Sequence, residues 1–592
     1  MSRSPAPTPV RPSPIPWDAT AARWYRHAVV YCVDVDTFAD SDGDGVGDLP
    51  GLTARLGHLG RLGVTCLWLN PIHPTPNRDD GYDVSDYYGV DPRLGTLGDF
   101  VELVRQAEEQ GIRVIMDLVV NHTSDEHPWF VSARSDPASP YRDWYVWSEQ
   151  EPADRFQGMV FPGEQHETWT LDDQAGAWFY HRFYRFQPDL NWRNPAVRAE
   201  IRKVMGFWLQ LGVAGFRVDA APFVIELVTP GPQPDEQDFA ILDEWRQFCQ
   251  WRRADAVLLG EANVKAEDVA RYYGSSTVAA DRMHLLFDFV SNPKLFLALA
   301  RGDADPLVEA ISGAVTLPDG AQRATFLRNH DELDLSRLSA EQREDVFAAF
   351  APEEDMRLYG RGIRRRLATM LGDDQRRLEL AYALQFSLPG TAVLRYGEEI
   401  GMGEDLSLKG RDAFRTPMQW DRSPNAGFSI ADAEALVRPV VADGAHGPDA
   451  VNVADQRRRE DSLLAFMERL IRVRRDCPEI GEGVASLASG EGIGLCVGGV
   501  PLGDGVTLPR GVLAHRIEAA GGVLLFVHNL TGDEQPVTLD LGDAPGDVEV
   551  LLTDAASRQA AAGSGRSRRP ADPAHEPLPP YGFRWVRLER RP

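Results

Sequence analysis

Cysteine is scarce in this sequence. Its 592 residues include only five, at positions 32, 66, 249, 477 and 496, and no two of them form a C-x-x-C pair. This odd and scattered set argues against a disulfide framework and against a cysteine-ligated zinc site. We therefore expect a cytoplasmic protein, since that compartment keeps thiols reduced.

Positive charge and long apolar runs are also lacking. The formal net charge is -27, so nucleic acids and anionic membranes are poor partners, because both select for basic patches. No apolar run approaches the roughly 20 residues that span a bilayer. The opening "MSRSPAPTPVRPSPIPWD" is rich in Pro and Ser and has no apolar signal-peptide core, so we expect residues 1–23 to be a disordered tail.

Acidic residues are plentiful, and they are densest in "DSDGDGVGD", residues 40–48. The carboxylates fall at positions 1, 3, 5 and 9 of a loop with glycine at position 6, a spacing typical of loops that wrap Ca²⁺. Position 12 is Gly51 instead of Glu, so this is not a complete EF-hand. The alternative is a solvated loop of repelling charges. The expected calcium ligands are Asp40, Asp42, Asp44, Asp48 and the carbonyl of Val46, and we expect the ion to be structural.

Eight short runs rich in Val, Ile and Leu recur along the chain, with amphipathic segments between most of them. Repeated βα units indicate parallel strands covered by helices, and eight units predict a (β/α)8 TIM barrel of the α/β class. The expected strands are residues 29–35, 64–71, 113–121, 214–220, 256–262, 284–289, 324–331 and 391–399.

Two stretches interrupt this pattern. Residues 123–186 are too long for an ordinary connection and are crowded with aromatic side chains, which predicts an inserted subdomain after the third strand. Gly-rich turns and short apolar strands predict a C-terminal all-β sandwich domain over residues 481–592. The catalytic barrel would then comprise residues 24–122 and 187–480.

Acidic residues stand where three of the expected strands end. Asp219 follows Arg217 on the fourth strand, Glu261 ends the fifth, and Asp331 ends the seventh. A single acid at such a place is more often an ion-pair partner. Three carboxylates that converge in one cleft perturb each other's pKa, which indicates acid/base or nucleophilic catalysis.

At these residues the chain resembles the alpha-amylase family, glycoside hydrolase family 13. The motifs that carry the resemblance are "DLVVNH" (117–122), "QPDLN" (187–191), "GFRVDA" (215–220), "GEAN" (260–263) and "RNHD" (328–331). The resemblance implies that Asp219 is the nucleophile of a retaining mechanism, Glu261 its general acid/base, and Asp331 the acid that binds the distorted sugar. Arg217 would orient Asp219 and keep it ionised.

Within this family the chain is similar to the oligo-1,6-glucosidase branch, and there most similar to the trehalose synthases. The phrases "NRDDGYDVSDY" (77–87), "HRFYRFQPDLN" (181–191) and "KGRDAFRTPMQW" (409–420) carry this likeness. It implies that Asp79 and Arg411 pair around the non-reducing end of the bound glucose. The other substrate-binding residues that it implies are Tyr82, His122, Phe183, Gln187, Arg217, His330 and Arg415, of which Tyr82, Phe183, Gln187 and Arg415 would line that pocket.

The resemblance also bears on linkage and on a second metal. Ala220 follows the nucleophile, and a small residue there resembles enzymes that act on α-1,4 bonds, so maltose is favoured over isomaltose as donor. The first strand departs from trehalose synthases, which typically carry a basic residue in place of Asp36. A second calcium site is implied for Asn121, Asp189 and Glu226 with the carbonyls of Phe223 and Val224.

These observations predict an enzyme that isomerises maltose to trehalose through a covalent glucosyl-enzyme, with some hydrolysis to glucose. A hydrolytic α-glucosidase and an α-1,4-glucosyltransferase with another acceptor stay open, because the chemical motifs are the same and pocket closure decides between them. A non-catalytic binding subunit is a further alternative. No organic cofactor is expected. The resemblance implies a maltose kinase as a partner, and the oligomeric state, including a homo-oligomer, stays open.

Overall fold

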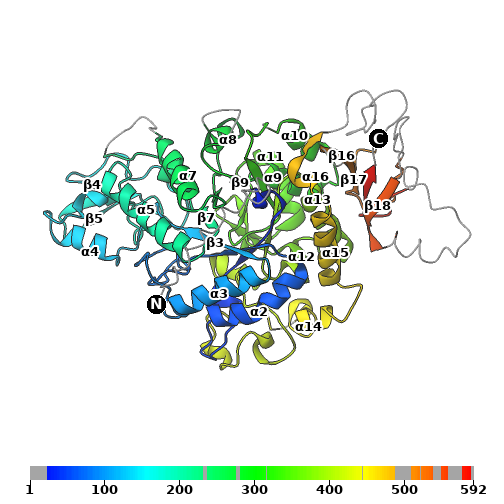
Figure 1. Ribbon diagram of the computed structural model, residues 1–592, viewed down its shortest axis with the longest axis horizontal. Coiled ribbons are helices and arrows are strands. Elements are labelled where there is room, and N and C mark those ends of the chain that lie inside the picture. The colour runs from blue at the N-terminus through cyan, green and yellow to red at the C-terminus, as the bar shows by residue number, and fades with distance from the viewer. Residues whose placement is uncertain are drawn as a thin grey trace, which may run out of the picture.

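The computed structural model describes residues 23–230, 237–274, 280–314, 316–442, 444–486, 509–519, 522–537, 548–555, 557 and 577–588. Its centre is a closed barrel of eight parallel strands in the order β1-β14-β10-β9-β8-β7-β3-β2 (Figure 1). This confirms the predicted TIM barrel. The strands are β1 (Val29–Val33), β2 (Cys66–Leu69), β3 (Arg113–Leu118), β7 (Gly215–Val218), β8 (Val257–Gly260), β9 (Leu285–Phe287), β10 (Gln322–Phe326) and β14 (Thr391–Arg395).

Side chains alternate between two layers along these strands, as the period of a β-strand dictates. Val30 and Cys32 of β1 pack with Cys66 and Trp68 of β2 in one buried cluster, together with inward residues of the other strands. Val29, Tyr31 and Val33 belong instead to the layer that packs against the helices. Both faces of β1 are therefore buried and apolar, which explains its continuous hydrophobic run in the sequence.

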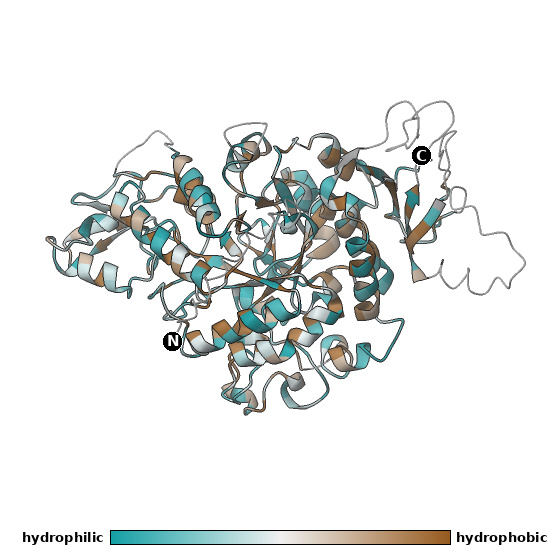
Figure 2. Cartoon of the chain, in the orientation of Figure 1, coloured by the Kyte–Doolittle hydropathy of each residue, from teal (hydrophilic) through white to brown (hydrophobic). Residues whose placement is uncertain are grey.

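Amphipathic helices surround the barrel (Figure 1) and present apolar stripes to it (Figure 2). In α3 (Leu97–Glu109) the buried stripe recurs at helical spacing with Phe100, Leu103 and Ala107, and Thr96 caps the N-terminus through the amide of Asp99. The other helices of eight or more residues that cover the barrel are α2 (Leu49–Leu62), α5 (Pro195–Gln210), α7 (Ala240–Arg252), α8 (Ala266–Tyr273), α9 (Ser291–Arg301), α10 (Asp305–Ser312), α11 (Ala340–Phe350), α13 (Gln375–Ser387) and α15 (Leu463–Arg475).

Two segments interrupt the barrel. The first follows β3 and holds α4 (Pro128–Ser135) and a sheet of β4 (Trp147–Ser148), β6 (Ala177–Tyr180) and β5 (Trp169–Asp172), where the inserted subdomain was expected. The second follows β10 and forms a small sheet of β11 (Leu333–Asp334), β13 (Gly362–Ile363) and β12 (Arg357–Leu358). The sequence analysis did not anticipate this second excursion, because its strands have only two residues each.

The C-terminal domain is an antiparallel sheet in the order β15-β16-β17-β19-β18. These strands are β15 (Val484–Ser486), β16 (Val512–Ala519), β17 (Gly522–Asn529), β18 (Val548–Thr553) and β19 (Phe583–Leu588). His515 of β16 lies with its Nε2 3.1 Å from the carbonyl of Ser387, which ties the sheet to the end of α13. The expected sandwich is represented among the described residues by this one sheet, and the expected tail, residues 1–22, lies outside them.

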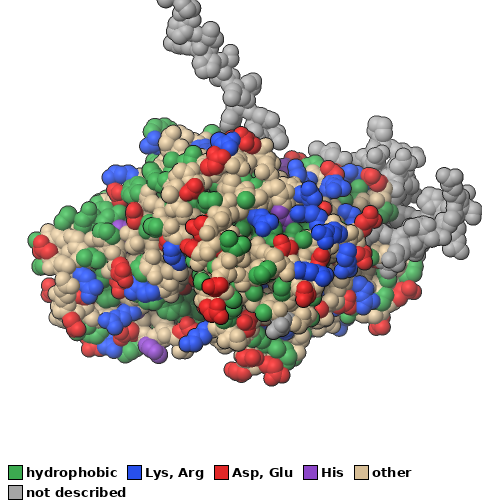
Figure 3. All heavy atoms as spheres, turned by 90° about the horizontal axis from the view of Figure 1, so that it is seen from below, with side chains coloured by type: hydrophobic (Ala, Val, Ile, Leu, Met, Phe, Trp, Pro, Cys, Tyr) green, Lys and Arg blue, Asp and Glu red, His purple; other side chains and the backbone are tan. Residues whose placement is uncertain are grey.

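Three further expectations from the sequence concern cysteines, membrane-spanning segments and surface charge. Cys32, Cys66, Cys249 and Cys477 are buried free thiols, and Cys496 lies outside the described residues. In the described part, no helix is both long enough and apolar enough to span a bilayer. On the face seen in Figure 3, acidic side chains are spread widely, whereas many of the basic ones gather toward the right of the view.

Candidate active site

Four acidic side chains gather at the mouth of the barrel, because the carboxyl ends of parallel strands share one rim. Asp117 lies near the end of β3, whereas Asp219 and Glu261 directly follow β7 and β8. Asp331 stands in the loop after β10, which ends at Phe326. The rule that polar strand ends meet therefore places the three predicted catalytic acids together.

The guanidinium of Arg217 joins three of these acids. Its Nη1 lies 2.5 Å from Oδ1 of Asp219 and 3.2 Å from Oδ1 of Asp117, and its Nη2 lies 2.8 Å from Oε2 of Glu261. The Arg217 side chain is 1% exposed, so these contacts form away from bulk water. One buried cation thus holds Asp219 and Glu261 on the two prongs of its fork.

Burial raises the pKa of both acids. It raises the pKa of Asp219 to about 6, against the opposing charge of Arg217. It raises the pKa of Glu261 to about 7, where Arg217 acts to lower the value and the neighbouring carboxylates of Asp219 and Asp331 act to raise it. Both carboxyls therefore titrate near neutral pH, and a retaining mechanism needs Asp219 ionised while Glu261 keeps its proton.

The backbone after Asp219 takes an uncommon conformation. Ala220 has φ 46°, in the left-handed region that side chains other than glycine seldom occupy. In this conformation its N–H donates to Oε2 of Glu261 at 3.2 Å. A locally unfavourable backbone therefore adds a second donor to the carboxylate of Glu261, as is common where function constrains the chain.

Asp331 has its own set of cations. Its Oδ1 lies 2.8 Å from Nη1 of Arg411 and 3.3 Å from Nη2 of Arg415, and its Oδ2 lies 3.2 Å from Nε2 of His330. Burial alone would raise the pKa of Asp331, but the charges of Arg411 and Arg415, together with the contact to His330, lower it below its usual range. Asp331 is therefore held ionised, whereas the pKa of Glu261 is raised.

Tyr82 connects the acids to the histidines. Its hydroxyl donates to Oδ2 of Asp117 at 2.9 Å and lies 2.7 Å from Nε2 of His330, whose ring stacks on the phenol. Nε1 of Trp68 donates to the other oxygen of Asp117 at 3.2 Å. His122 lies with its Nε2 3.1 Å from the carbonyl of Tyr82. These contacts fix Tyr82, His122 and His330 as one wall of the site.

A cavity of about 720 Å³ opens at this rim, within the range of ordinary ligand sites. All three predicted catalytic acids line it. The predicted substrate-binding residues that also line it are Asp79, Tyr82, His122, Phe183, His330 and Arg411.

Three other predicted residues, Gln187, Arg217 and Arg415, are buried and do not belong to the described lining of this cavity. Gln187 donates from Nε2 to Asp79 at 2.8 Å, and Arg415 donates from Nε to the carbonyl of His330 at 2.8 Å. In this structure Gln187 and Arg415, which were predicted to line the pocket, lie behind its described lining. Their polar groups are satisfied by the residues that do line it, so they support the wall from behind.

Asp79 and Arg411 both line the cavity, but no ion pair joins these two described residues. Arg411 instead lies 2.8 Å from Asp331 and 2.9 Å from Oε2 of Glu332. Burial raises the pKa of Asp79 to about 6, and the charge of Arg411 opposes this rise from a distance. The expected direct pair is thus replaced by a through-space interaction, because Arg411 has two nearer carboxylates.

The sequence analysis missed several residues at this site. Phe161 of the inserted segment packs on Tyr359 of the second excursion with ring centroids 5.1 Å apart, and Arg361 donates to the carbonyl of Val160 at 2.9 Å. No sequence signal joins these segments, which are about two hundred residues apart. Asp117 could have been found, because it opens the "DLVVNH" motif.

The acidic loop of residues 40–48 offers three converging ligands. Carboxylate oxygens of Asp40, Asp42 and Asp48 lie within 4.8 Å of one another, and this all-oxygen donor set suits Ca²⁺. Asp44 is exposed and does not share that cluster; its Oδ1 accepts from the N–H of Val46 at 2.8 Å. The loop therefore fits a hard cation with three of the four predicted carboxylates already grouped.

The second expected metal site is only partly assembled. A small cavity is lined by Asn121, Asp189, Phe223 and Glu226, whereas Val224 is buried on α6 (Ala221–Val224) outside that lining. Asp189 accepts from the amide of Asn121 at 3.0 Å, and Glu226 pairs with Nη2 of Arg182 at 2.6 Å. Burial raises the pKa of Asp189 to about 7. Arg182 thus already supplies a positive charge to Glu226.

Comparison with known proteins supports this geometry. The family model "Alpha amylase, catalytic domain" matches residues 33–351 and 363–483, and a model of a D-apionate lactonase C-terminal immunoglobulin-like domain matches residues 509–586. The trehalose synthase/amylase TreS of Mycobacterium tuberculosis is 41% identical over 530 residues, which cover 89% of this chain and 85% of that protein. The trehalose synthase of Pimelobacter sp. is 39% identical over 538 residues, with 89% and 91% covered.

Among solved structures, trehalose-6-phosphate hydrolase of Bacillus licheniformis superposes with a TM-score of 0.73 at 25% sequence identity. The match covers 96% of this chain and all of that one. Barrel, rim acids and sequence similarity agree over most of the chain. The chain therefore belongs to the alpha-amylase family of glycoside hydrolases, as an enzyme related to the trehalose synthases.

Proposed function

We propose that this enzyme isomerises maltose to trehalose by intramolecular transfer of a glucosyl unit. The observation that carries the proposal is the single Arg217 fork that holds Asp219 and Glu261 in one cavity. Retaining enzymes keep their two carboxyls roughly 5 Å apart, and acids on the two prongs of one guanidinium fit that spacing better than the wider gap of inverting enzymes. The names of the similar trehalose synthases support the choice of substrate.

In the first step, the Asp219 carboxylate attacks the anomeric carbon of the non-reducing glucose of maltose. The bond to the bridging oxygen breaks, and Glu261 gives its proton to that oxygen, so free glucose and a glucosyl ester of Asp219 form. In the second step, the released glucose presents its anomeric hydroxyl. Glu261 takes the proton of that hydroxyl, the new bond forms, and Asp219 leaves as a carboxylate.

Binding roles follow from the cavity walls. Asp331 is held ionised by Arg411 and Arg415, so it can accept hydrogen bonds from sugar hydroxyls as the ring distorts. His122 and His330 stand on the adjoining wall and offer polar edges to the same sugar. Phe183, whose ring packs 5.1 Å from that of His122, supplies an apolar face.

Hydrolysis is the second candidate outcome. It requires only that water, instead of glucose, attacks the glucosyl ester, and solvent reaches this site, since the Glu261 side chain is 24% exposed. We therefore propose glucose as a side product. An α-1,4-glucosyltransferase would use the same ester with a different acceptor, so the product mixture separates these functions.

We also propose that the loop of Asp40, Asp42 and Asp48 holds one Ca²⁺, joined by Asp44 and the Val46 carbonyl when the ion is bound. The ion would neutralise the loop carboxylates, and no catalytic step passes through it. The second site, at Asn121, Asp189 and Glu226, is a weaker proposal because Arg182 already pairs with Glu226. We further propose a cytoplasmic location and a maltose kinase as a protein partner, without an organic cofactor.

The test is to incubate the purified protein with maltose and to resolve trehalose from glucose by chromatography. Isomerisation predicts trehalose as the main product, and the reverse reaction predicts maltose from trehalose. Glucose alone would identify an α-glucosidase, and longer glucosides would identify a transferase with another acceptor. An inert wild-type protein that still binds maltose would identify the non-catalytic alternative.

A further inference from the structure

An arginine outside every motif lies close behind the active site. Arg438 belongs to the irregular segment after β14, and its side chain is only 10% exposed. Its Nε lies 2.9 Å from Oδ1 of Asp412 and its Nη1 lies 3.4 Å from Oδ2 of Asp36, while Nη2 bonds Oδ1 of Asp80. One guanidinium therefore contacts three carboxylates from three distant parts of the chain.

The first arm from Arg438 runs through Asp80 to the catalytic rim. Asp80 bonds Arg438 with one carboxylate oxygen and Arg415 with the other. Arg415 in turn contacts Oδ1 of Asp331 at 3.3 Å and donates to the carbonyl of His330 at 2.8 Å. Asp80 has φ 47°, an uncommon backbone for a residue other than glycine, so these two arginines also hold a strained residue beside Asp79.

The second arm runs through Asp412. This residue lies on the short 3-10 helix η6 (Gly410–Phe414), which also carries Arg411 and is followed directly by Arg415. Arg411 contacts Asp331 at 2.8 Å and Glu332 at 2.9 Å. By holding Asp412, Arg438 holds the helix that carries Arg411 and that directly precedes Arg415.

We propose that Arg438 is a positioning residue for Asp331, acting through Asp80–Arg415 and through the helix that carries Arg411. The proposal rests on the proposed function, because it assigns a support to that same active site. Arg438 does not line the described active-site cavity, so it acts through these residues and not by touching the sugar.

The segment that carries Arg438 is hydrogen-bonded to the acidic loop of residues 40–48. The N–H of Val437 donates to the carbonyl of Gly45 at 2.9 Å, and the hydroxyl of Ser429 donates to Oδ2 of Asp40 at 2.5 Å. Gly45 has φ 96°, and a Cβ there would meet the carbonyl of Ala435 at 2.2 Å, so only glycine permits this approach.

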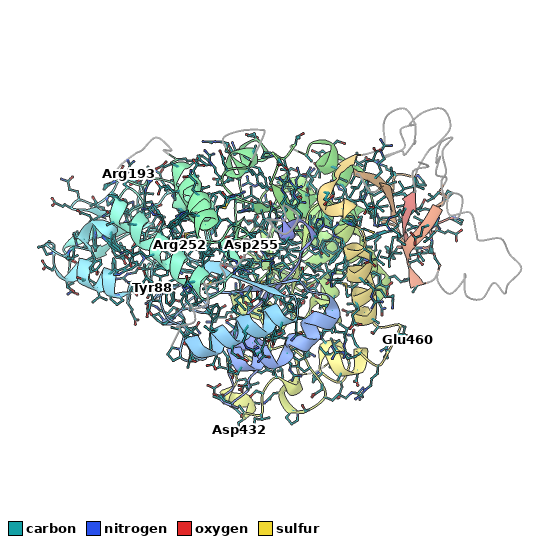
Figure 4. The ribbon with its side chains drawn as sticks, in the orientation of Figure 1. Tyr88, Arg193, Arg252, Asp255, Asp432 and Glu460 are labelled. Atoms are coloured by element: carbon teal, nitrogen blue, oxygen red, sulfur yellow. The ribbon has the colours of Figure 1, made fainter. Side chains whose placement is uncertain are left out.

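The exposed outer end of the same segment carries Asp432, at the lower edge of Figure 4. The loop of residues 40–48 thus sets the place of Arg438, although it does not line the active-site cavity. The loop of residues 40–48 therefore also helps to hold Asp331 in place, through Arg438.

The test compares Arg438→Gln with Arg438→Lys. The lysine variant keeps the charge, but a single ammonium does not reproduce a fork that reaches three carboxylates. We expect kcat of the glutamine variant to fall at least about tenfold while KM changes less than about threefold, because Asp331 acts most strongly on the distorted sugar. The lysine variant should recover part of that loss.

Arg198→Gln is the matched control. Arg198 also contacts two carboxylates, Asp238 at 2.5 Å and Glu244 at 3.5 Å, but it lies on α5 away from the described active-site cavity. Assays are run well below the melting temperature of every variant. If Arg438→Gln matches Arg198→Gln in kcat and differs from wild type only in melting temperature, Arg438 is merely structural and the proposal is overturned.

Asp412→Asn alters only the contact between Arg438 and Asp412. It therefore still tests the proposal if Arg438→Gln does not fold. The Asp412 side chain is 46% exposed, so this variant should fold and should lose about two- to fivefold in kcat. An unchanged kcat would remove the second arm.

For the first arm, Asp80→Asn and Arg438→Gln are combined. Residues that act as one unit are non-additive, so the double variant should lose little more than the worse single one. Fully additive losses would mean that Arg438 does not act through Asp80.

Every variant is assayed with maltose and with 4-nitrophenyl α-glucoside. Wild type that cleaves the aryl glucoside but makes no trehalose would contradict the proposed isomerisation while leaving the role of Arg438 measurable. Wild type that makes trehalose, together with an Arg438→Gln variant of equal kcat, would contradict only the positioning role. Wild type that cleaves neither substrate would overturn both.

Discussion

Two groups of carboxylates in this molecule differ in almost every respect except their chemistry. The acids of residues 40–48 are satisfied mainly by backbone N–H groups and hydroxyls; Asp40, for example, accepts from the N–H of Gly43 at 2.7 Å and of Gly45 at 2.9 Å. The acids at the barrel rim are buried or half-buried and share arginines, with Arg217 contacting Asp219 and Glu261.

The partners decide what each group can do. Burial acts to raise the pKa of Asp40, but the hydroxyl of Ser429 and the loop amides lower it overall, so that carboxylate stays ionised and available to a cation. At the rim, burial outweighs a shared arginine and raises the pKa of Glu261 to about 7. The same functional group thus keeps its charge in one setting and has its pKa raised toward neutrality in the other.

The largest effect should come from Asp219→Asn. An amide cannot form the glucosyl ester, so we expect kcat with maltose to fall by at least about 10³-fold. Circular dichroism should show an unchanged fold, because the amide keeps the shape of the carboxyl. Folded variant protein with near-normal activity would show that Asp219 is not the nucleophile. The rim carboxylates would then not differ in role from those of residues 40–48 in the way described.

Glu261→Gln should lose nearly as much activity with maltose, because the leaving glucose needs a proton. It should recover partly on 4-nitrophenyl α-glucoside or α-glucosyl fluoride, whose leaving groups need none. The comparison is the ratio of variant to wild-type rates on the two classes of substrate. Equal ratios on both would count against the acid role.

The pH dependence of activity should reflect the carboxyls at the barrel rim and not those of residues 40–48. Activity requires Asp219 ionised and Glu261 protonated, so kcat/KM should be bell-shaped, with limbs near the pKa values of about 6 and about 7. The basic limb should disappear in Glu261→Gln measured with the aryl glucoside. A profile that is flat from pH 5 to 8 would contradict this assignment.

The raised pKa of Glu261 also makes the stability of the folded protein depend on pH. The folded pKa of Glu261 lies above its ordinary value of 4.5, so its contribution to stability is present below about pH 4.5 and is lost as pH rises through about 7. The melting temperature of Glu261→Gln relative to wild type should therefore rise between pH 5 and pH 8. A constant difference across this range would show that Glu261 is not held protonated by burial.

The smallest effect should come from the loop. If Ca²⁺ binds only the folded protein, free calcium at a hundredfold excess over its Kd adds about 2.7 kcal/mol of stability. Chelation should lower the melting temperature, and Asp42→Ala combined with Asp44→Ala should abolish that response. A double variant that melts at or above the wild-type temperature, with an unchanged response to chelator, would show that the loop binds no cation.

Local pattern was enough to predict the eight strands and the three rim acids. Each strand is buried on both faces, so its apolar run is continuous, and the shared rim brings Asp219, Glu261 and Asp331 together. What could not be predicted depends on pairs far apart in the chain. Arg438 meets Asp80 across 358 residues, and neither residue carries a local mark of that contact.

Gln187 and Arg415 were predicted to line the pocket, and in this structure they lie behind its lining. Sequence motifs identify residues that surround a sugar pocket, yet they do not separate a side chain that touches the cavity from one that holds its wall. Only the hydrogen bonds to Asp79 and to the carbonyl of His330 show that these two side chains lie in the supporting layer.

The pairing of β1 with β14 has a consequence for how the chain is made. Val30 pairs with Val393, so the barrel closes only by joining its earliest strand to its latest one. During synthesis from the N-terminus, β1 therefore keeps one edge without its partner until residue 395 has emerged from the ribosome. An exposed edge of this kind invites pairing with other chains. Slow, chaperone-assisted production should thus yield more soluble enzyme than rapid overproduction.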